Sequence, residues 1–160
     1  MTAVGQINAG SRITASAIRG VAPLTAYKAT GQTVTSSTTL VNDSDLFLTI
    51  AANGVYVVQA AILVTGSSGG NFKYTWTIPS GANGNMSSLQ ENTSSTLVND
   101  GPSAWTATVT GSASQGFWLY GLLVNSSTAG TLQLQWAQNA SNGTGTTVGA
   151  YSYLTAWQIQ

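Results

Sequence analysis

Four carboxylates are the residues of this sequence that could do acid–base or metal chemistry: Asp43, Asp45, Glu91 and Asp100. Asp43 and Asp45 lie in the segment NDSD, and Asp100 lies in NDGP; both segments are typical of turns. Two carboxylates could hydrolyse a glycoside, and Asp43 with Asp45 and nearby carbonyls could bind calcium. Carboxylates in such segments usually accept hydrogen bonds from their own turn backbone, so we expect that role and leave calcium as the alternative.

The other residues that catalysis and metal binding commonly need are missing. The chain has no His and no Cys, which removes the commonest general base, the commonest zinc ligands and any disulfide. Its serines therefore have no His to activate them, and its glycines form no phosphate-binding loop. We expect a protein that is not an enzyme and that has neither a catalytic residue nor a cofactor or metal.

Charge is scarce and balanced. The chain has four basic and four acidic residues, so its net charge is zero. Binding to nucleic acid is therefore not expected. Hydrophobic residues make up 42% of the chain and aromatic residues 9%, a composition typical of a folded domain. We expect no membrane insertion, because no apolar run approaches the roughly 20 residues of a membrane helix. The first residues, MTAVGQINAG, do not resemble a signal peptide.

Alternating apolar and polar residues are the main pattern from residue 24 onward. The segment GTLQLQW directs Leu132, Leu134 and Trp136 to one side, and NFKYTWTIP does the same with its aromatic residues. An Asn-Gly pair, Asn53-Gly54, lies between two apolar runs and predicts a hairpin. Seven or eight short strands separated by turns predict an all-β protein, an antiparallel β-sandwich over 24–160. We expect residues 1–23 to be a separate N-terminal arm, with a simple disordered tail as the alternative, and GSRITASAIRGV is its single candidate helix.

Two of the expected strands are apolar on both faces: GVYVVQAAILV at 54–64 and GFWLYGLLV at 116–124. One face of each strand can form the core of the sandwich, and the other needs a second partner, because large apolar patches are rare on monomers. We therefore expect a homo-oligomer. Trp76, Trp105, Trp136 and Trp157 are assigned to the core. The expected interface residues are Val55, Val57, Ala61 and Leu63, or Trp118, Tyr120 and Leu122.

Two resemblances extend this interpretation. GVYVVQAAILV resembles the G-x-Y-x-x-x-x-x-x-L strand of the C1q/TNF-like jelly roll, although the chain lacks that family's phenylalanine-rich strand and collagen stalk. The run INAGSRITASAIRG, then TLVNDSDL and FKYTWTIPSGA, is similar to small virion proteins of tailed phages that infect actinobacteria. The first resemblance implies that the sandwich is of the antiparallel jelly-roll type. Together the two imply a homotrimeric β-domain on the surface of a phage particle, made in the host cytoplasm.

The resemblances also imply partners. Arg12, Ile13, Ile18 and Arg19 of the arm are the expected contacts with other virion proteins, such as the major capsid protein or a tail protein. A compact domain without a repetitive shaft favours a capsid decoration protein. The alternative is a tail fibre or minor tail protein with a carbohydrate-binding domain for a host surface glycan, in which Trp118 could stack on a sugar.

Overall fold

The computed structural model describes residues 10, 12, 22–90, 98–100, 106–109 and 115–160. These residues contain twelve β-strands and no helix, and every strand pair is antiparallel, which confirms the predicted all-β fold class. The strands are β1 (Leu24–Tyr27), β2 (Gln32–Val34), β3 (Val41–Ile50), β4 (Val55–Thr65), β5 (Phe72–Thr77), β6 (Asn83–Gln90), β7 (Val98–Asp100), β8 (Thr106–Val109), β9 (Gln115–Val124), β10 (Gly130–Ala137), β11 (Thr146–Val148) and β12 (Tyr153–Gln158).

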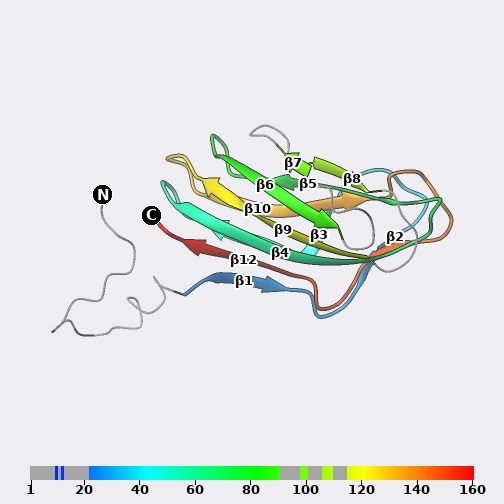
Figure 1. The fold of residues 1–160 in the computed structure, drawn as a ribbon, viewed down its shortest axis with the longest axis horizontal. Coiled ribbons are helices and arrows are strands. Elements are labelled where there is room, and N and C mark those ends of the chain that lie inside the picture. Colours follow the sequence, from blue (N-terminus) through cyan, green and yellow to red (C-terminus); the bar gives the residue numbers. More distant parts are fainter. Residues whose placement is uncertain (1–9, 11, 13–21, 91–97, 101–105, 110–114) are drawn as a thin grey trace.

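Two sheets pack face to face (Figure 1). The first sheet has the order β1-β12-β4-β9-β6-β7, and β11 pairs with β4 and carries β2 at its other edge. The second sheet has the order β3-β10-β5-β8. We call them sheet A and sheet B.

The strand pairing is that of a jelly roll. Within the two sheets β1 pairs with β12, β3 with β10, β4 with β9 and β5 with β8, so early strands pair with late strands in a nested series. Nested antiparallel pairs that alternate between two sheets define the eight-stranded jelly roll. The hairpin of β6 and β7 extends sheet A beyond β9.

The core lies between the sheets and follows the predicted alternation. Leu132, Leu134 and Trp136 of β10 are fully buried, as predicted. Aromatic rings connect the sheets, because Phe72 of β5 stacks on Phe117 of β9 with ring centroids 5.6 Å apart. Trp76 is also buried, whereas Trp105 and most of the candidate helix, residues 11 and 13–21, lie outside the described residues.

The Asn-Gly pair makes a turn, but the predicted hairpin is wrong. Asn53 has the left-handed conformation, with φ of 59°, that such turns need. The two strands that it connects, β3 and β4, belong to different sheets, and each pairs with strands from much later in the chain. The turn is therefore a corner between the sheets, because turn chemistry specifies local backbone and not the pairing partner.

Candidate functional site

The acidic segment NDSD forms a bulge in β3. Gln133 of β10 pairs with Phe47, and Gln135 pairs with Asn42, so β3 advances three residues further than β10 between these two pairs. The extra residues leave backbone groups without ladder partners, and side chains satisfy several of them. Gln133 Nε2 donates to the carbonyl oxygens of Asp43 and Leu46 at 3.0 and 3.3 Å.

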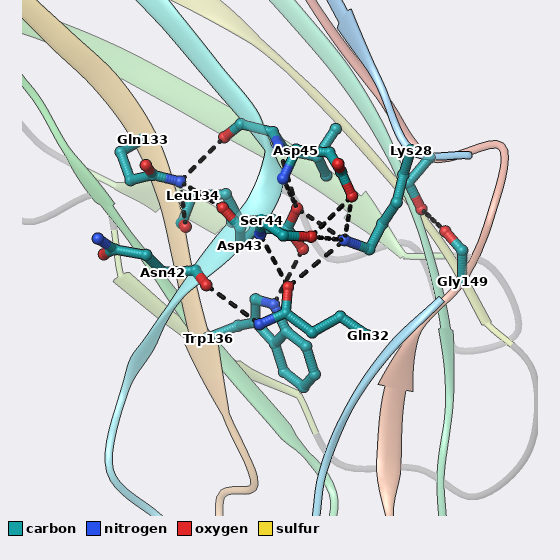
Figure 2. Close-up of polar contacts among 12 residues, drawn as sticks. Lys28, Gln32, Asn42, Asp43, Ser44, Asp45, Gln133, Leu134, Trp136 and Gly149 are labelled. Atoms are coloured by element: carbon teal, nitrogen blue, oxygen red, sulfur yellow. Dashed lines mark hydrogen bonds and ion pairs between the residues drawn. The ribbon is translucent and has the colours of Figure 1, made fainter. Parts of the chain in front are cut away.

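Lys28 reaches this bulge from the segment that follows β1. Its side chain is fully buried, and Nζ lies 3.0 Å from Asp43 Oδ1, 2.8 Å from Asp45 Oδ2 and 3.0 Å from Ser44 Oγ (Figure 2). The backbone of Lys28 is held as well, because its N–H donates to Ser152 O. Lys28 thus connects the β1 edge of sheet A to β3 of sheet B.

Asp43 is the buried centre of the cluster. Its Oδ1 accepts hydrogen bonds from the backbone N–H groups of Asp45 and Leu46, each at 3.0 Å, and its Oδ2 accepts one from Trp136 Nε1 at 3.1 Å. The prediction that this carboxylate bonds to its own local backbone is therefore confirmed. Sequence reasoning missed Lys28 and Trp136, which come from distant parts of the chain.

Asp45 differs from Asp43 in exposure, since about a third of its side chain, 36%, is accessible. Hydrogen bonds from Lys28 Nζ and Ser44 Oγ hold the pKa of Asp45 below its ordinary value, against a small opposing effect of burial. The carboxylate is therefore ionised at neutral pH.

The Lys28 ammonium lies between Asp43 and Asp45, where the alternative of a calcium site would place the cation, so the geometry favours an ion pair at this position. In the described part of the chain no group of three or more acidic, His or Cys residues is placed to hold a metal. Glu91 and the side chain of Asp100 lie outside the description, so only two of the four carboxylates can be seen together. The arrangement of Lys28, Asp43 and Asp45 is that of a structural ion-pair cluster.

The outer face of sheet A is the second candidate site, and it is apolar. β4 and β9 are neighbours, and their register sets Val57 beside Leu122 and Ala61 beside Trp118. The two sets of residues that the sequence offered as alternatives therefore form one surface. The large apolar side chains exposed on β4 and β9 are Leu63, Trp118, Tyr120, Leu122 and Val124, with Trp118 52% exposed.

The outer face of sheet B has the opposite character. Thr131, Gln133 and Gln135 of β10 lie on it, beside Thr75 and Thr77 of β5. Phe47 of β3 is the large apolar side chain exposed there among the described residues. Sheet B therefore has the polar outer face of an ordinary solvated sheet, and sheet A does not.

Two assignments from the sequence concern the outer face of sheet A: Ala61 was assigned to the interface and Trp157 to the core. Ala61 is only 5% exposed, because it lies between the larger side chains of Trp118 and Tyr153 on the neighbouring strands, so it offers little contact area. Trp157 was assigned to the core, but it is 36% exposed and pairs with Val57 on the outer face of sheet A. The core side of β12 is formed by Leu154 and Ala156 instead.

Two of the hollows in the described part of the chain lie on the apolar face. One of about 180 Å³ lies over β4 and β9 and is lined by Gln59, Trp118, Tyr120 and Tyr153 together with the backbone of neighbouring residues. The other, of about 350 Å³, lies between β6 and β9 and is lined by Asn83, Gly84, Asn85, Leu122 and Val124. Both hollows combine apolar or aromatic walls with amide groups.

The predicted docking residues of the arm are almost all undescribed. Arg12 is described and is exposed, whereas Ile13, Ile18 and Arg19 lie outside the described residues. No contact of the arm can therefore be assigned from the geometry.

Comparisons with known proteins complete the description of the site. A scan against models of known protein families finds no match, and a search of curated proteins finds no significantly similar sequence. In the residues that the structure describes, no helix is long and apolar enough to cross a membrane. The class defined by the fold is an antiparallel jelly-roll β-sandwich with one apolar outer face.

Proposed function

We propose that this protein is a structural protein of a bacteriophage particle: a homotrimeric β-domain displayed on the virion surface, as a capsid decoration protein. The observation that carries the self-association is the apolar outer face of sheet A, with Leu63, Trp118, Leu122 and Val124 exposed side by side on β4 and β9. Soluble monomers rarely expose contiguous apolar patches of this kind.

Burial of this face against other copies has a clear energetic basis. A large apolar side chain contributes about 1.5–3 kcal/mol when it is transferred fully from water to a packed interior. Several such side chains lie on the outer face of sheet A, and the face lacks charged groups in its described part, so no ionic desolvation opposes contact. Closed symmetry then limits growth, which favours a compact oligomer over a filament.

The virion assignment rests on the resemblance to small virion proteins of actinobacteriophages, and the trimer rests on the resemblance to C1q/TNF-like domains. The nested pairing of β1 with β12 and β4 with β9 supports both, because a jelly roll is the fold that they imply. The hydrogen bonds of both Asp43 carboxylate oxygens and the pairing of Asp45 with Lys28 support a structural role over a catalytic one.

The self-association is tested by Leu122→Asp. Leu122 is exposed, so the aspartate can be accommodated by a folded monomer but leaves an unpaired charge in a packed interface. Light scattering should give three times the chain mass of 16.4 kDa for the wild type and the chain mass for the variant. Thr131→Asp, on the exposed polar face of sheet B, is the matched control and should remain a trimer. A monomeric wild type at micromolar concentration would refute the trimer.

The place on the particle is tested separately. Electron microscopy of phage particles that carry a labelled version of this protein should show the label on the head lattice. Label on the tail alone would replace decoration by the tail-protein alternative.

A carbohydrate-binding tail domain is the second candidate, because Trp118, Tyr120 and Tyr153 line one hollow together with the amide of Gln59. Aromatic faces stack on sugar rings, and amides bond to sugar hydroxyls. This candidate requires the hollow to stay open in the assembled protein. Titration of the wild type with a panel of monosaccharides, followed by tryptophan fluorescence, should then give saturable binding that Trp118→Ala abolishes.

A further inference from the structure

The chain contains three Asn-Gly pairs, and the structure describes all of them: Asn53-Gly54, Asn83-Gly84 and Asn142-Gly143. In such a pair the backbone nitrogen of the glycine can attack the side-chain amide carbon of the asparagine. Glycine allows this best, because it has no Cβ to hinder the approach or the backbone rotation. Sequence alone does not distinguish the three pairs, but their surroundings in the fold differ.

The pair at the start of β6 has the arrangement that the reaction needs. The Gly84 N–H donates to Asn83 Oδ1 at 2.8 Å, so the amide carbon bonded to that oxygen lies beside the glycine nitrogen. Asn83 is exposed and Gly84 is half-buried, so water and hydroxide can reach the contact. Among the described residues β7 pairs with β6 only from Met86 onward, which leaves this end of the strand open on that edge.

The other two Asn-Gly pairs are arranged differently. Gly54 is buried, so its nitrogen is shielded from solvent. Asn142 Oδ1 accepts hydrogen bonds from the Thr144 N–H at 2.8 Å and from Ser67 Oγ at 3.2 Å. These bonds direct the Asn142 amide to the residue after Gly143 and hold it there.

A fourth asparagine shows that contact alone is not sufficient. Asn125 Oδ1 accepts from the N–H of the next residue, Ser126, at 2.9 Å, much as in the Asn83 pair. Asn125 is only 6% exposed, however, and its Nδ2 donates to the carbonyl oxygens of Ala51 and Thr128 at 2.7 and 3.0 Å. The amide nitrogen that would have to leave is therefore held, and the following residue carries a side chain.

We propose that Asn83 is a site of spontaneous deamidation, with the Gly84 nitrogen as the nucleophile. The Gly84 nitrogen gives its proton to hydroxide and forms a bond to Asn83 Cγ. Nδ2 takes a proton from water and leaves as ammonia, which gives a cyclic imide. Water then opens the imide at one of its two carbonyl carbons and gives aspartate or isoaspartate. One water is consumed and one ammonia is released, and no cofactor is needed.

The reaction changes the charge of the outer face of sheet A. Asn83 lines the hollow of about 350 Å³ together with Leu122 and Val124. Either product carries a carboxylate that is ionised at neutral pH, and the described part of this face otherwise has no charged group. The reaction needs one chain and water, so failure of the proposed trimer would not alter these expectations.

The test follows all three pairs in one sample. The protein is incubated in alkaline buffer, both folded and unfolded in concentrated urea, and peptide mapping by mass spectrometry measures the conversion at each asparagine. In urea the three rates should be similar, because glycine follows each asparagine. In the folded protein Asn83 should react at least about tenfold faster than Asn53 and Asn142, because its amide is held against the attacking nitrogen.

Two variants test the chemistry. Gly84→Ala should slow the conversion of Asn83, whereas Gly143→Ala, at a position with open space for a Cβ, should leave it unchanged. Asn83→Gln should remove most of the ammonia that the folded wild type releases, since the longer side chain would have to close a larger ring.

Three results would overturn the inference. The first is equal rates at the three pairs in the folded protein. The second is protection of Asn83 by folding to the same extent as Asn53 and Asn142. The third is an unchanged Asn83 rate in folded Gly84→Ala, since the glycine nitrogen would then not be the nucleophile.

Discussion

Removal of the Lys28 ammonium should strongly destabilise the fold. Lys28→Met keeps an unbranched side chain of similar length in the same buried space. It leaves the Asp43 carboxylate, itself fully buried, without its cation. Loss of one partner from a buried ion pair costs about 3–5 kcal/mol. Asp43 keeps hydrogen bonds from Asp45, Leu46 and Trp136, so we expect the lower end of that range, about 3 kcal/mol.

Asp45→Asn is the matched comparison, because Asp45 is the other partner of the same ammonium. Its side chain is partly exposed, so its loss leaves Lys28 still paired with Asp43. Pairs screened by solvent contribute about 1 kcal/mol or less. Lys28→Met removes the ammonium from both carboxylates, whereas Asp45→Asn removes only the partly exposed ion pair. The two losses of unfolding free energy should therefore differ about threefold.

Urea and thermal unfolding at neutral pH measure both costs. For a chain of this length about 1 kcal/mol corresponds to a Tm change of about 2–4 °C, so Lys28→Met should melt about 6–12 °C below the wild type. Asp45→Asn should melt within about 4 °C of it. All samples need one protein concentration, since self-association raises apparent stability. A Lys28→Met variant as stable as the wild type, or an equally damaging Asp45→Asn, would refute the buried-pair argument.

Three further predictions concern pH, catalysis and the arm. The lowered pKa of Asp45 stabilises the fold above the unfolded pKa of about 4, and this contribution is lost as the pH falls through the folded value; urea midpoints across that range should therefore fall more steeply for the wild type than for Asp45→Asn. No glycan should be hydrolysed by the protein; turnover that disappears when any one of the four carboxylates is replaced by an amide would contradict this. Deletion of residues 1–22 should leave an equally stable trimer that no longer enters phage particles, and either normal incorporation or loss of the trimer would contradict docking by the arm.

Alternation was sufficient to predict the core side of strands that are apolar on one face only. In β10 the burial of Leu132, Leu134 and Trp136 follows directly from the two-residue period, which is a local property of the backbone. The all-β sandwich followed from the number and spacing of such segments, and the jelly-roll type from the resemblance of residues 54–64 to a C1q/TNF-like strand. These features need no knowledge of which strands pair.

Features that depend on pairing could not be predicted in the same way. The Lys28–Asp43 contact requires the register shift between β3 and β10, and nothing in the local sequence fixes that shift. The Asn53-Gly54 turn was predicted, but the strands on its two sides, β3 and β4, lie in different sheets. Each pairs with strands from far along the chain instead of forming the local hairpin. Local turn chemistry constrains a few dihedral angles, whereas pairing reflects the packing of the whole sandwich.

The assignment of Trp157 to the core was wrong, because a strand that is apolar on both faces does not show by alternation which face is the core. Alternation assigns Tyr153, Thr155 and Trp157 to one face of β12, but it does not say which face is the core. The isolated polar residues decide this, because a core position would leave their polar groups without water. Thr155 on β12, Gln59 on β4 and Tyr120 on β9 all lie on the outer face of sheet A, in one row. The polar residue within each apolar strand therefore marks the outer face and assigns Trp157 to it.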